Sequence, residues 1–273
     1  MVNCTVKYCG VTIKPSRLQY IHLPILVVVG MKYIASCSFG KDSLAMVLLL
    51  IEKGYPLDEV VFYDTEMEFQ AIYNNRDKLS KILEEKNIKF TVLKDVLPFT
   101  YRAFEKEVKT RSGIIKRGYN WCGGSPARWG TSGKLSAIKK HYKENYDNEV
   151  IVEYVGVAAD EAQRIEKYRT KRDKNIKIYP LTEWNMTEKD CLQYCYDHGW
   201  NWHEDGHELY ELLDRVSCWC CGNKNQKELR NIYEKMPEYW KKLKWYEDKC
   251  HVPYKGKGIE YFEKKFTMKG GEK

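Results

Sequence analysis

Six consecutive residues early in the chain have the composition of an anion-binding loop. The segment Ser38–Ser43 reads Ser-Phe-Gly-Lys-Asp-Ser, and it lies between the apolar runs Tyr33–Cys37 and Leu44–Ile51. This order predicts a strand, a tight turn with glycine and a helix. The first N–H groups of a helix lack intrahelical partners, and the helix dipole favours negative charge there. With two hydroxyls and the Lys41 amine nearby, the turn suits a phosphate group.

Acidic residues follow a second apolar run. Val60–Tyr63 leads directly into Asp64 and, two positions on, Glu66. Beside a nucleotide, Asp64 could hold the adenine, the ribose or a Mg²⁺ ion bound to phosphates. Taken alone, an Asp after a strand is also typical of a turn or a helix cap.

A third strand end carries a similar set of polar residues. Gly156 lies near the end of the apolar run Val150–Val157 and permits close approach of the backbone to a ligand. Asp160 and Arg164 follow, and the arginine could pair with phosphate or sulfate oxygens. A helix start whose arginine pairs with a neighbouring acid would give the same pattern. Three such ends after a phosphate-type loop favour the nucleotide site.

The cysteines suggest a second chemistry. Cys218 and Cys221 have C-x-x-C spacing with Cys220 between them, and Cys122 lies in a distant loop flanked by glycine. Thiolates at this spacing can bind one metal centre, and the spacing does not distinguish an iron–sulfur cluster from zinc. His203 and His207 are possible zinc partners or ordinary surface residues. The remaining cysteines indicate core or incidental positions.

Composition and charge set the broad class. The chain has 273 residues, 43% of them hydrophobic and 31% charged, as expected for a globular protein. Its formal net charge of +8 is compatible with a polyanionic partner or with a cationic active site. No apolar run approaches the roughly 20 residues of a membrane span. Ten cysteines do not make a disulfide scaffold at this length, and beside a phosphate loop they predict a reducing cytoplasm.

Short apolar runs that alternate with helical patterns predict an α/β fold with a parallel, doubly wound sheet. The predicted strands are Tyr33–Cys37, Val60–Tyr63, Lys89–Leu93, Val150–Val157 and Ile176–Tyr179. The predicted helices are Ser43–Glu52, Glu68–Lys86, Gly133–Tyr146 and Thr187–His198, the last with a capping box formed by Thr187 and Asp190. In such a sheet ligands bind at the carboxyl ends of the strands, where each motif above falls.

The chain changes character along its length. Residues 1–30 form an N-terminal extension of uncertain status, and residues 31–180 form the nucleotide-binding domain. From residue 181 Trp and Tyr become dense and strand patterns disappear, which predicts a helical, cysteine-bearing part to residue 250. This part includes a helical stretch over Glu228–Tyr246 that restarts at Pro237. Residues 251–273 are rich in Gly and Lys and predict a mobile tail.

Taken together, these motifs resemble the phosphoadenosine phosphosulfate (PAPS) reductase family of PP-loop enzymes, within the adenine-nucleotide α-hydrolase-like superfamily. The resemblance covers roughly residues 31–225, with Phe39 where the family usually has glycine. It implies phosphate binding by the loop, Asp64 near the nucleoside, and a far wall of the pocket made by three further residues. The loop residues are Ser38, Gly40, Lys41, Asp42 and Ser43, and those of the far wall are Gly156, Asp160 and Arg164.

The resemblance also suggests a role for the cysteines. Superfamily members that move sulfur often hold a [4Fe-4S] cluster through a C-x-x-C pair and a remote cysteine, an arrangement that Cys218, Cys221 and Cys122 match. Cys220 would be the fourth ligand, or that position would stay open for a sulfur species. The chain lacks the Glu-Cys-Gly segment that carries the reactive cysteine of PAPS reductases and has only Cys250 in that region. This loss leaves nucleotide binding untouched but weakens the expectation of thiol attack on a sulfonate.

The leading hypothesis is an enzyme that uses ATP to adenylate an acceptor and then transfers sulfur to it. Lys41 and the loop N–H groups would stabilise developing charge, while Asp42 or Asp64 would orient the phosphates directly or through Mg²⁺. The acceptor could be a nucleic acid such as tRNA or DNA, since basic residues occur over 106–117 and 164–177 and Tyr119, Trp121 and Trp129 could stack bases. A sulfur-donor protein or a thioredoxin-like reductant would be a further partner. The alternatives are a PAPS reductase that releases sulfite and a non-catalytic nucleotide-binding module with structural zinc.

Overall fold

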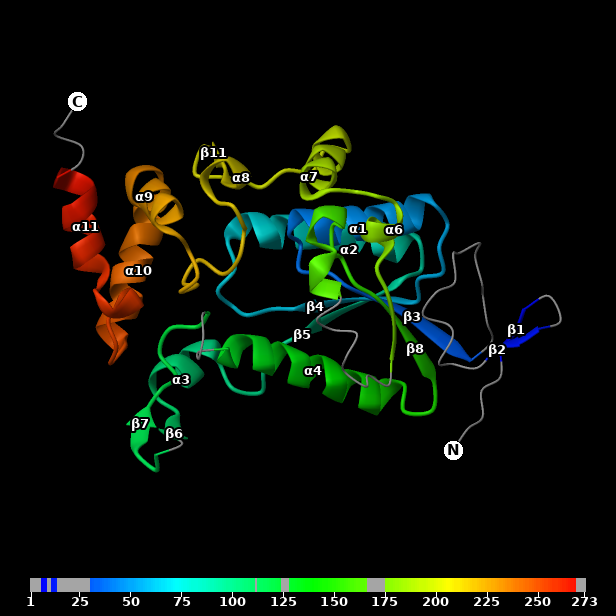
Figure 1. The fold of residues 1–273 in the computed structure, drawn as a ribbon, viewed down its shortest axis with the longest axis horizontal. Helices are drawn as coiled ribbons and strands as arrows, with labels where there is room; N and C mark the ends of the chain where they lie inside the picture. The colour runs from blue at the N-terminus through cyan, green and yellow to red at the C-terminus, as the bar shows by residue number, and fades with distance from the viewer. Residues whose placement is uncertain are drawn as a thin grey trace. The chain divides into compact units, whose positions relative to one another are not determined.

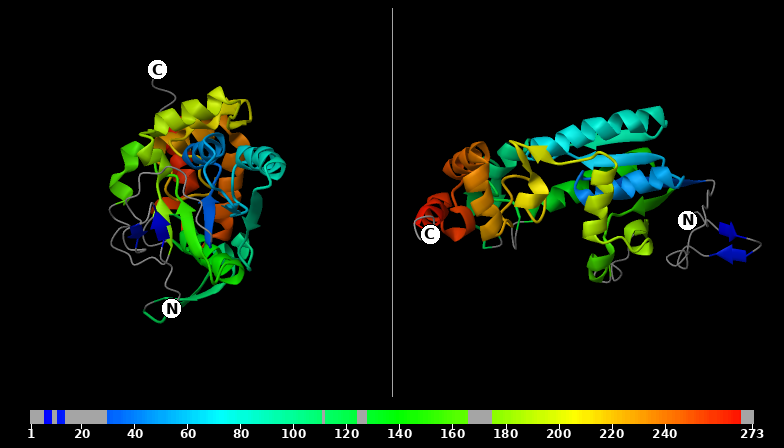
Figure 2. Two further views of the ribbon diagram at one scale, coloured as in Figure 1. Left: turned by 90° about the vertical axis from the view of Figure 1, so that its right-hand side faces the viewer. Right: turned by 90° about the horizontal axis from the view of Figure 1, so that it is seen from above.

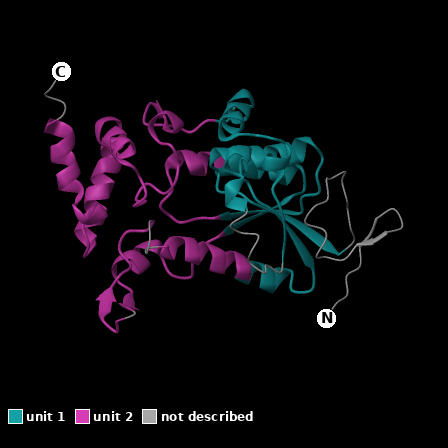
Figure 3. Ribbon diagram, in the orientation of Figure 1, with its two compact units in different colours: residues 1–62, 76–92, 140–200 teal, residues 63–75, 93–139, 201–273 magenta. Residues whose placement is uncertain are grey.

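The computed structural model describes the backbone of residues 6–8 and 11–13 and all atoms of residues 30–110, 112–123, 128–165 and 175–268. Two compact units are present (Figure 3). Unit 1 comprises Met1–Phe62, Arg76–Val92 and Lys140–Trp200, and unit 2 comprises Tyr63–Asn75, Leu93–Lys139 and Asn201–Lys273. Each unit combines three separate segments, whereas the predicted domains follow one another along the chain. That consecutive division stays a prediction.

A five-stranded sheet has the order β5-β4-β3-β8-β9. Its strands are β3 (Met31–Ser36), β4 (Glu59–Tyr63), β5 (Lys89–Leu93), β8 (Val150–Tyr154) and β9 (Ile176–Ile178). β3 pairs in parallel with β4 and with β8, and β8 pairs in parallel with β9. The chain therefore winds outward in both directions from β3, and the predicted α/β, doubly wound fold is confirmed.

Helices cover both faces of this sheet. In unit 1, helix α1 packs on α7, and both lie on the face opposite residues 140–145, the last turns of α4 (Figure 1). The helices that follow the sheet strands are α1 (Lys41–Glu52), α2 (Gln70–Glu85), α4 (Trp129–Asn145), α6 (Pro180–Glu183) and α7 (Glu188–Asp197), with a 3₁₀ turn η2 at Ala159–Glu161. Because both faces are covered, β4 is buried along its whole length, which explains its continuous apolar sequence.

Most predicted boundaries lie within a few residues of those observed. β5 occupies Lys89–Leu93 as predicted, and α7 begins after Thr187 with the predicted capping box to Asp190. α1 starts at Lys41 rather than Ser43, so the lysine belongs to the helix and not to the turn. β8 ends at Tyr154, which leaves Gly156 in the loop beyond the strand.

Unit 2 contains a group of three C-terminal helices. α9, α10 and α11 pack on one another, and they lie side by side in all three views (Figures 1 and 2). The elements not yet given are β1 (Val6–Tyr8), β2 (Val11–Ile13), α3 (Phe99–Phe104), β6 (Glu107–Lys109), β7 (Ile115–Arg117), β10 (His203–Glu204), β11 (His207–Glu208), α8 (Leu209–Leu212), α9 (Gln226–Lys235), α10 (Pro237–Lys249), η3 (Tyr254–Gly256) and α11 (Ile259–Met268). Within the described ranges, no helix has the length and apolarity needed to cross a bilayer.

Two predictions for the C-terminal part are wrong. Strand structure does not disappear after residue 181, because β10 and β11 form a hairpin through Asp205 and Gly206, both with positive φ. The tail is not mobile throughout. Helix α11 buries Ile259, Phe262 and Phe266, whose spacing places them on one face.

Candidate functional site

The predicted phosphate loop lies where the strand order of the sheet reverses. β3 ends at Ser36 and leads into the loop, and its neighbour β8 ends at Tyr154 and leads to Gly156. A Cβ atom on Gly156 would lie 3.1 Å from the Ser43 Cα and 3.3 Å from its backbone N. Only glycine fits this approach without displacing the loop. The close neighbour of Gly156 is thus the loop itself, and the predicted contact with a ligand stays a prediction.

Serine hydroxyls hold the loop in shape. The Ser43 Oγ accepts a hydrogen bond from the Ser38 N–H and lies 3.1 Å from the Ser38 Oγ, and it donates to the Gly40 carbonyl at 3.1 Å. Gly40 is the N-cap of α1 and offers no side chain to the first-turn N–H groups. The helix start therefore keeps the donor character that suits an anion.

Phe39 stands where the family usually has glycine, and its packing explains how the loop accommodates a side chain there. Its φ of 59° is in the left-handed region, which is costly for a residue with a side chain. The ring is fully buried and packs edge-on against Phe62 at 5.0 Å and Phe90 at 6.1 Å between centroids. This burial offsets the backbone strain and anchors the loop to the sheet.

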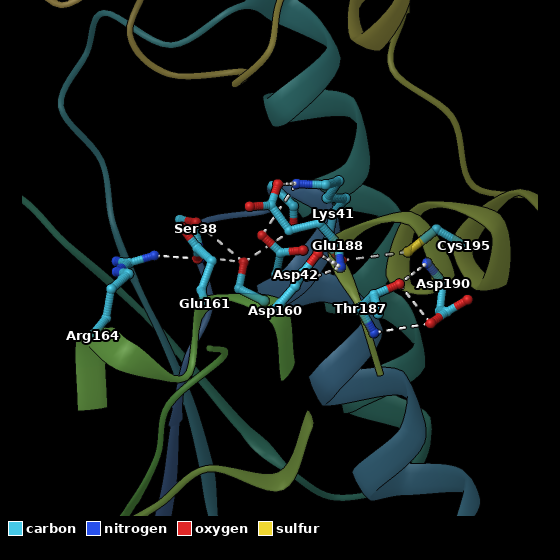
Figure 4. Close-up of polar contacts among 12 residues, drawn as sticks. Ser38, Lys41, Asp42, Asp160, Glu161, Arg164, Thr187, Glu188, Asp190 and Cys195 are labelled. Carbon is cyan, nitrogen blue, oxygen red and sulfur yellow. Dashed lines mark hydrogen bonds and ion pairs between the residues drawn. The ribbon is translucent and has the colours of Figure 1, made fainter. Parts of the chain in front are cut away.

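A lysine and several carboxylates surround the loop (Figure 4). Lys41 is buried, with its Nζ 2.5 Å from the Glu188 Oε2 and 3.4 Å from the Asp42 Oδ2. Glu188 is the first residue of α7, and its N–H donates to the Asp160 Oδ1 at 3.1 Å. The segment after β8 is thereby tied to the helix that presents Glu188.

Arg164 pairs with Glu161 through its guanidinium, as Figure 4 shows. This is the acid–arginine pair that the sequence left as an alternative to phosphate binding. Arg164 is 42% exposed at its side chain, so its guanidinium is also accessible to a ligand. Residues 166–174 of the basic segment lie outside the described part of the chain.

Burial and neighbouring carboxylates raise the pKa of Asp42. Burial is the main cause, the Lys41 ammonium opposes it, and the negative charges of Glu188 and Glu161 add to it, giving a pKa of about 6. Burial lowers the pKa of Lys41, but its contacts with Asp42 and Glu188 outweigh this and leave it raised. The Lys41 side chain is thus cationic at neutral pH, whereas the pKa of Asp42 lies only about one unit below neutral pH. The Asp42 Oδ1 is buried without a hydrogen-bond partner.

Asp64 belongs to unit 2 and is held by protein groups. Its Oδ1 accepts hydrogen bonds from the Glu66 N–H at 2.7 Å and the Tyr73 hydroxyl at 2.9 Å, and its Oδ2 lies 3.3 Å from the Lys94 Nζ. It also lines a hollow of about 330 Å³, open mouth included, with Arg102 and Trp129. Its predicted place near the nucleoside stays a prediction.

Unit 2 also brings the predicted cysteines together from two distant loops. The Gly222 N–H donates to the Cys122 carbonyl at 2.7 Å, and the Tyr254 hydroxyl donates to the Cys221 carbonyl at 2.9 Å. A Cβ atom on Gly222 would lie 3.2 Å from the Cys122 carbonyl oxygen, so glycine is needed where the loops meet. These contacts define a thiol site made of Cys122, Cys218, Cys220 and Cys221.

The thiol site is held mainly as neutral thiols. The contact with Cys218 lowers the pKa of Cys122, but the contact with Cys220 and burial raise it well above its ordinary value. The contact with Cys122 and then burial raise the pKa of Cys218. Burial also raises the pKa of Cys220. Since thiolates are the nucleophiles and metal ligands, these thiols must lose protons before they react.

A carboxylate and a hydroxyl adjoin Cys218. The Cys218 Sγ lies 3.6 Å from the Glu68 Oε1 and 3.4 Å from the Thr65 Oγ1, and the Thr65 hydroxyl donates to Glu68 at 2.7 Å. Burial raises the pKa of Glu68, against the lowering effect of the Thr65 hydroxyl. Glu68 is therefore placed to accept a proton from Cys218.

The thiol site does not form a ready metal site. Among the residues that the structure describes, no three His, Cys, Asp or Glu side chains are arranged to hold one metal ion. Metal binding by Cys122, Cys218, Cys220 and Cys221 stays a prediction. His203 and His207 lie in the β10–β11 hairpin and are not grouped with the thiols in any described metal site.

The structure bears on two further predictions: base stacking by the tryptophans, and Cys250 as a reactive cysteine. Trp121 and Trp129 are buried against Tyr246 and Phe99, with ring centroids 4.5 and 4.6 Å apart, so both rings pack within unit 2. Trp129 in addition lines the hollow beside Asp64. Burial raises the pKa of Cys250 to about 12, which makes this thiol a poor substitute for a reactive cysteine.

Sequence reasoning missed Glu188, Glu68 and Thr65. Glu188 is 147 positions from Lys41, and it reads from sequence as an ordinary first-turn acid of a helix. Glu68 lies 150 positions from Cys218. For Glu188 the one signal was the acid-rich start of α7, which is shared by many helices without a site, and α2 has no acidic residue in its first turn.

The parallel sheet, the glycine loop at its switch point and the polar residues beyond β8 define a PP-loop type of α/β protein. A family model described as the phosphoadenosine phosphosulfate reductase domain matches residues 32–224. The chain belongs to this family, and the resemblance read from its motifs is confirmed.

Two proteins of Methanocaldococcus jannaschii are similar to this chain. Uncharacterized protein MJ0066 is 29% identical over 219 residues, covering 75% of this chain and 39% of its own length. Uncharacterized protein MJ0973 is 28% identical over 213 residues, covering 76% of this chain and 45% of its own length. The chain thus spans less than half the length of these relatives.

A solved structure is also similar, the U34-tRNA thiolase NcsA from Methanococcus maripaludis with its [4Fe-4S] cluster. It shares 17% sequence identity with this chain, with a TM-score of 0.43 over 80% of this chain and 72% of that one.

Proposed function

We propose that this protein is a PP-loop enzyme of sulfur metabolism that binds an adenine nucleotide through Ser38–Ser43 and uses ATP to adenylate an acceptor. The observation that carries the proposal is the loop at the switch point of the sheet, with the Lys41 ammonium beside the start of α1. Family membership supports the same chemistry class.

In the proposed reaction an acceptor oxygen attacks the α-phosphorus of ATP, and the bond to the β-phosphate breaks to release pyrophosphate. Lys41 and the loop N–H groups stabilise the charge that develops on the phosphate oxygens. Asp42 would orient the phosphates, directly or through Mg²⁺, and Gly156 would contact the nucleotide. Arg164 and Asp160 line the far side of its pocket.

Sulfur transfer would follow at the thiol site. A donor persulfide passes its outer sulfur to a deprotonated thiol of the site and leaves as the donor thiol. The terminal sulfur of the new persulfide attacks the acceptor carbon that bears the adenylate, so that a C–S bond forms, the C–O bond breaks and AMP leaves. A second thiol of the site then breaks the S–S bond to the acceptor, which releases the thiolated acceptor and leaves a disulfide that a thioredoxin-like reductant reduces. The supporting observation is the joining of the Cys122 loop and the Cys218–Gly222 loop by the hydrogen bond from Gly222. Metal and acid-labile sulfide analysis after anaerobic purification tests the predicted [4Fe-4S] cluster against zinc.

The acceptor is proposed to be a nucleic acid. The net charge is +8, and the β6–β7 hairpin exposes Lys109, Lys116 and Arg117. Such a surface attracts phosphate backbones in a salt-dependent way. The described cysteines are all free thiols, which fits a reducing compartment such as the cytoplasm.

The proposal is tested by following pyrophosphate release from ATP with and without added tRNA or DNA. Release that depends on the nucleic acid and is lost in Lys41→Ala supports it. Sulfite release from PAPS, without pyrophosphate release from ATP, would replace it with the reductase. The high pKa of Cys250 argues against that alternative.

A further inference from the structure

Glu188 is a charged contact of Lys41 that comes from outside the predicted phosphate-site motifs. Its Oε2 lies 2.5 Å from the Lys41 Nζ, closer than the 3.4 Å between that nitrogen and Asp42. The lysine is only 6% exposed, so water screens this ion pair weakly. The pair is therefore a substantial interaction and not a surface contact.

The carboxylate is held in this position by the structure around it. The capping box of Thr187 and Asp190 fixes the start of α7, and the Glu188 N–H donates to Asp160. Further along the same helix, the Cys195 Sγ lies 3.6 Å from the Lys41 carbonyl oxygen. Helix α7 thus contacts the backbone of Lys41 through Cys195 and places Glu188 beside the Lys41 side chain.

A phosphate oxygen and a carboxylate oxygen bind an ammonium group in the same way. Both accept short, charge-assisted hydrogen bonds along the directions of its N–H donors. A nucleotide phosphate on Lys41 must therefore take the place that Glu188 occupies, or crowd a negative charge against it. Glu161 adds negative charge to the same region, since it and Glu188 both raise the pKa of Asp42.

We infer that Glu188 sets the anion affinity of the phosphate site, because its carboxylate occupies Lys41 until a phosphate chain displaces it. This inference rests on the proposed function, because it takes Lys41 as a phosphate ligand. Because each phosphate-bearing ligand must first displace Glu188 from Lys41, its affinity is lowered by a similar factor. Small anions such as inorganic phosphate then bind too weakly to occupy the site, while a nucleotide with further contacts to its sugar and base still binds.

The test is calorimetric titration of the full chain and its Glu188→Gln variant with ATP, pyrophosphate and inorganic phosphate. Because a hydrogen bond to a charged group contributes about 1.5–3 kcal/mol, Glu188→Gln is expected to tighten binding of all three ligands by about tenfold to a hundredfold. Inorganic phosphate is expected to become measurable in the variant.

Two control variants separate this role from a structural one. Asp197→Asn removes a charge from the exposed far end of the same helix, and Asp190→Asn weakens the capping box without touching Lys41. Neither control should tighten phosphate binding, although Asp190→Asn should lower the melting temperature. Equal or weaker binding in Glu188→Gln, with ATP still bound by the wild type, overturns the inference alone. Failure of both proteins to bind any of the ligands overturns the proposed function and the inference with it.

Discussion

The phosphate loop of unit 1 and the thiol site of unit 2 use opposite chemical means to hold reactive groups. At the phosphate loop, Lys41 stays charged because Glu188 and Asp42 stabilise its ammonium form. At the thiol site, contact with Cys220 and burial keep Cys122 protonated, and contact with Cys122 and burial keep Cys218 protonated. The first site therefore needs an anion that displaces a carboxylate, whereas the second needs a group that removes a proton.

Both sites depend on glycine where two backbone segments meet. Gly156 lies against the Ser43 backbone, and Gly222 lies against the Cys122 carbonyl. Each contact joins a loop to a segment far from it in sequence. The comparison shows that backbone proximity places the reactive side chains, while the local charge decides their protonation.

The largest expected effect is the loss of ATP affinity when the Lys41 ammonium of the phosphate loop is removed. Lys41→Ala removes the charge that a phosphate would contact, and ATP affinity should fall by about a hundredfold or more. Isothermal titration measures this, with Lys53→Ala at the other end of α1 as the matched control. Unchanged affinity in Lys41→Ala would show that this lysine serves only its internal ion pairs.

A glycine substitution tests the backbone contact at the phosphate loop. Gly156→Ala places a Cβ atom 3.1 Å from the Ser43 Cα, and the free energy of unfolding should fall by about 2 kcal/mol. Gly130→Ala is the control from the thiol site, since its Cβ would meet Cys122 at an ordinary 3.7 Å. Urea unfolding of both variants should show a large effect only at Gly156, and equal effects would refute the distinction.

The pH dependence of stability reports the carboxylates around Lys41. The pKa of Asp42 is raised to about 6, so the folded state holds this proton more tightly than the unfolded state. The resulting stability is present below pH 4 and is lost as the pH rises through 6, amounting to about 3 kcal/mol. Asp42→Asn should remove this part of the slope between pH 4 and 7 in denaturant titrations. A variant with the same slope as the wild type would contradict the raised pKa.

The smallest expected effect is on thiol reactivity. Since Cys122 and Cys218 are neutral near pH 7.5, their alkylation by iodoacetamide should be at least about tenfold slower than that of an unhindered thiol. Mass spectrometry of time-resolved digests measures each rate. The Glu68 charge helps to raise the pKa of Cys218, so Glu68→Gln should speed the labelling of Cys218. It should leave Cys191 unchanged, because Cys191 is buried in unit 1. Rapid labelling of Cys218 at neutral pH would contradict the neutral thiol site.

Sequence patterns predicted the framework well because its signals are local. β5 was placed residue for residue, and the capping box at Thr187 and the restart of the helix at Pro237 were both confirmed. The hairpin at His203–Glu208 was missed because its short strands carry no apolar alternation. The spacing of Phe262 and Phe266 could have revealed α11, but the Gly- and Lys-rich composition obscured it.

The site was predictable only in part. The loop Ser38–Ser43 carries a motif, so its type and its position after a strand could be read directly. The Glu188–Lys41 pair and the Glu68–Cys218 contact join residues about 150 positions apart, and no local pattern encodes them. The burial of Trp121 and Trp129 likewise follows from tertiary packing, because exposed and buried tryptophans look alike in sequence.

The central claim is that the turn between β3 and α1 binds the phosphates of an adenine nucleotide. Amide hydrogen exchange of the full chain with and without saturating ATP tests it most directly, by mass spectrometry of peptides that cover residues 38–46. The account predicts slower exchange in these peptides, with a weaker effect around Gly156 and none in α11. ATP binding that leaves the exchange of residues 38–46 unchanged, or no binding at all, would contradict it.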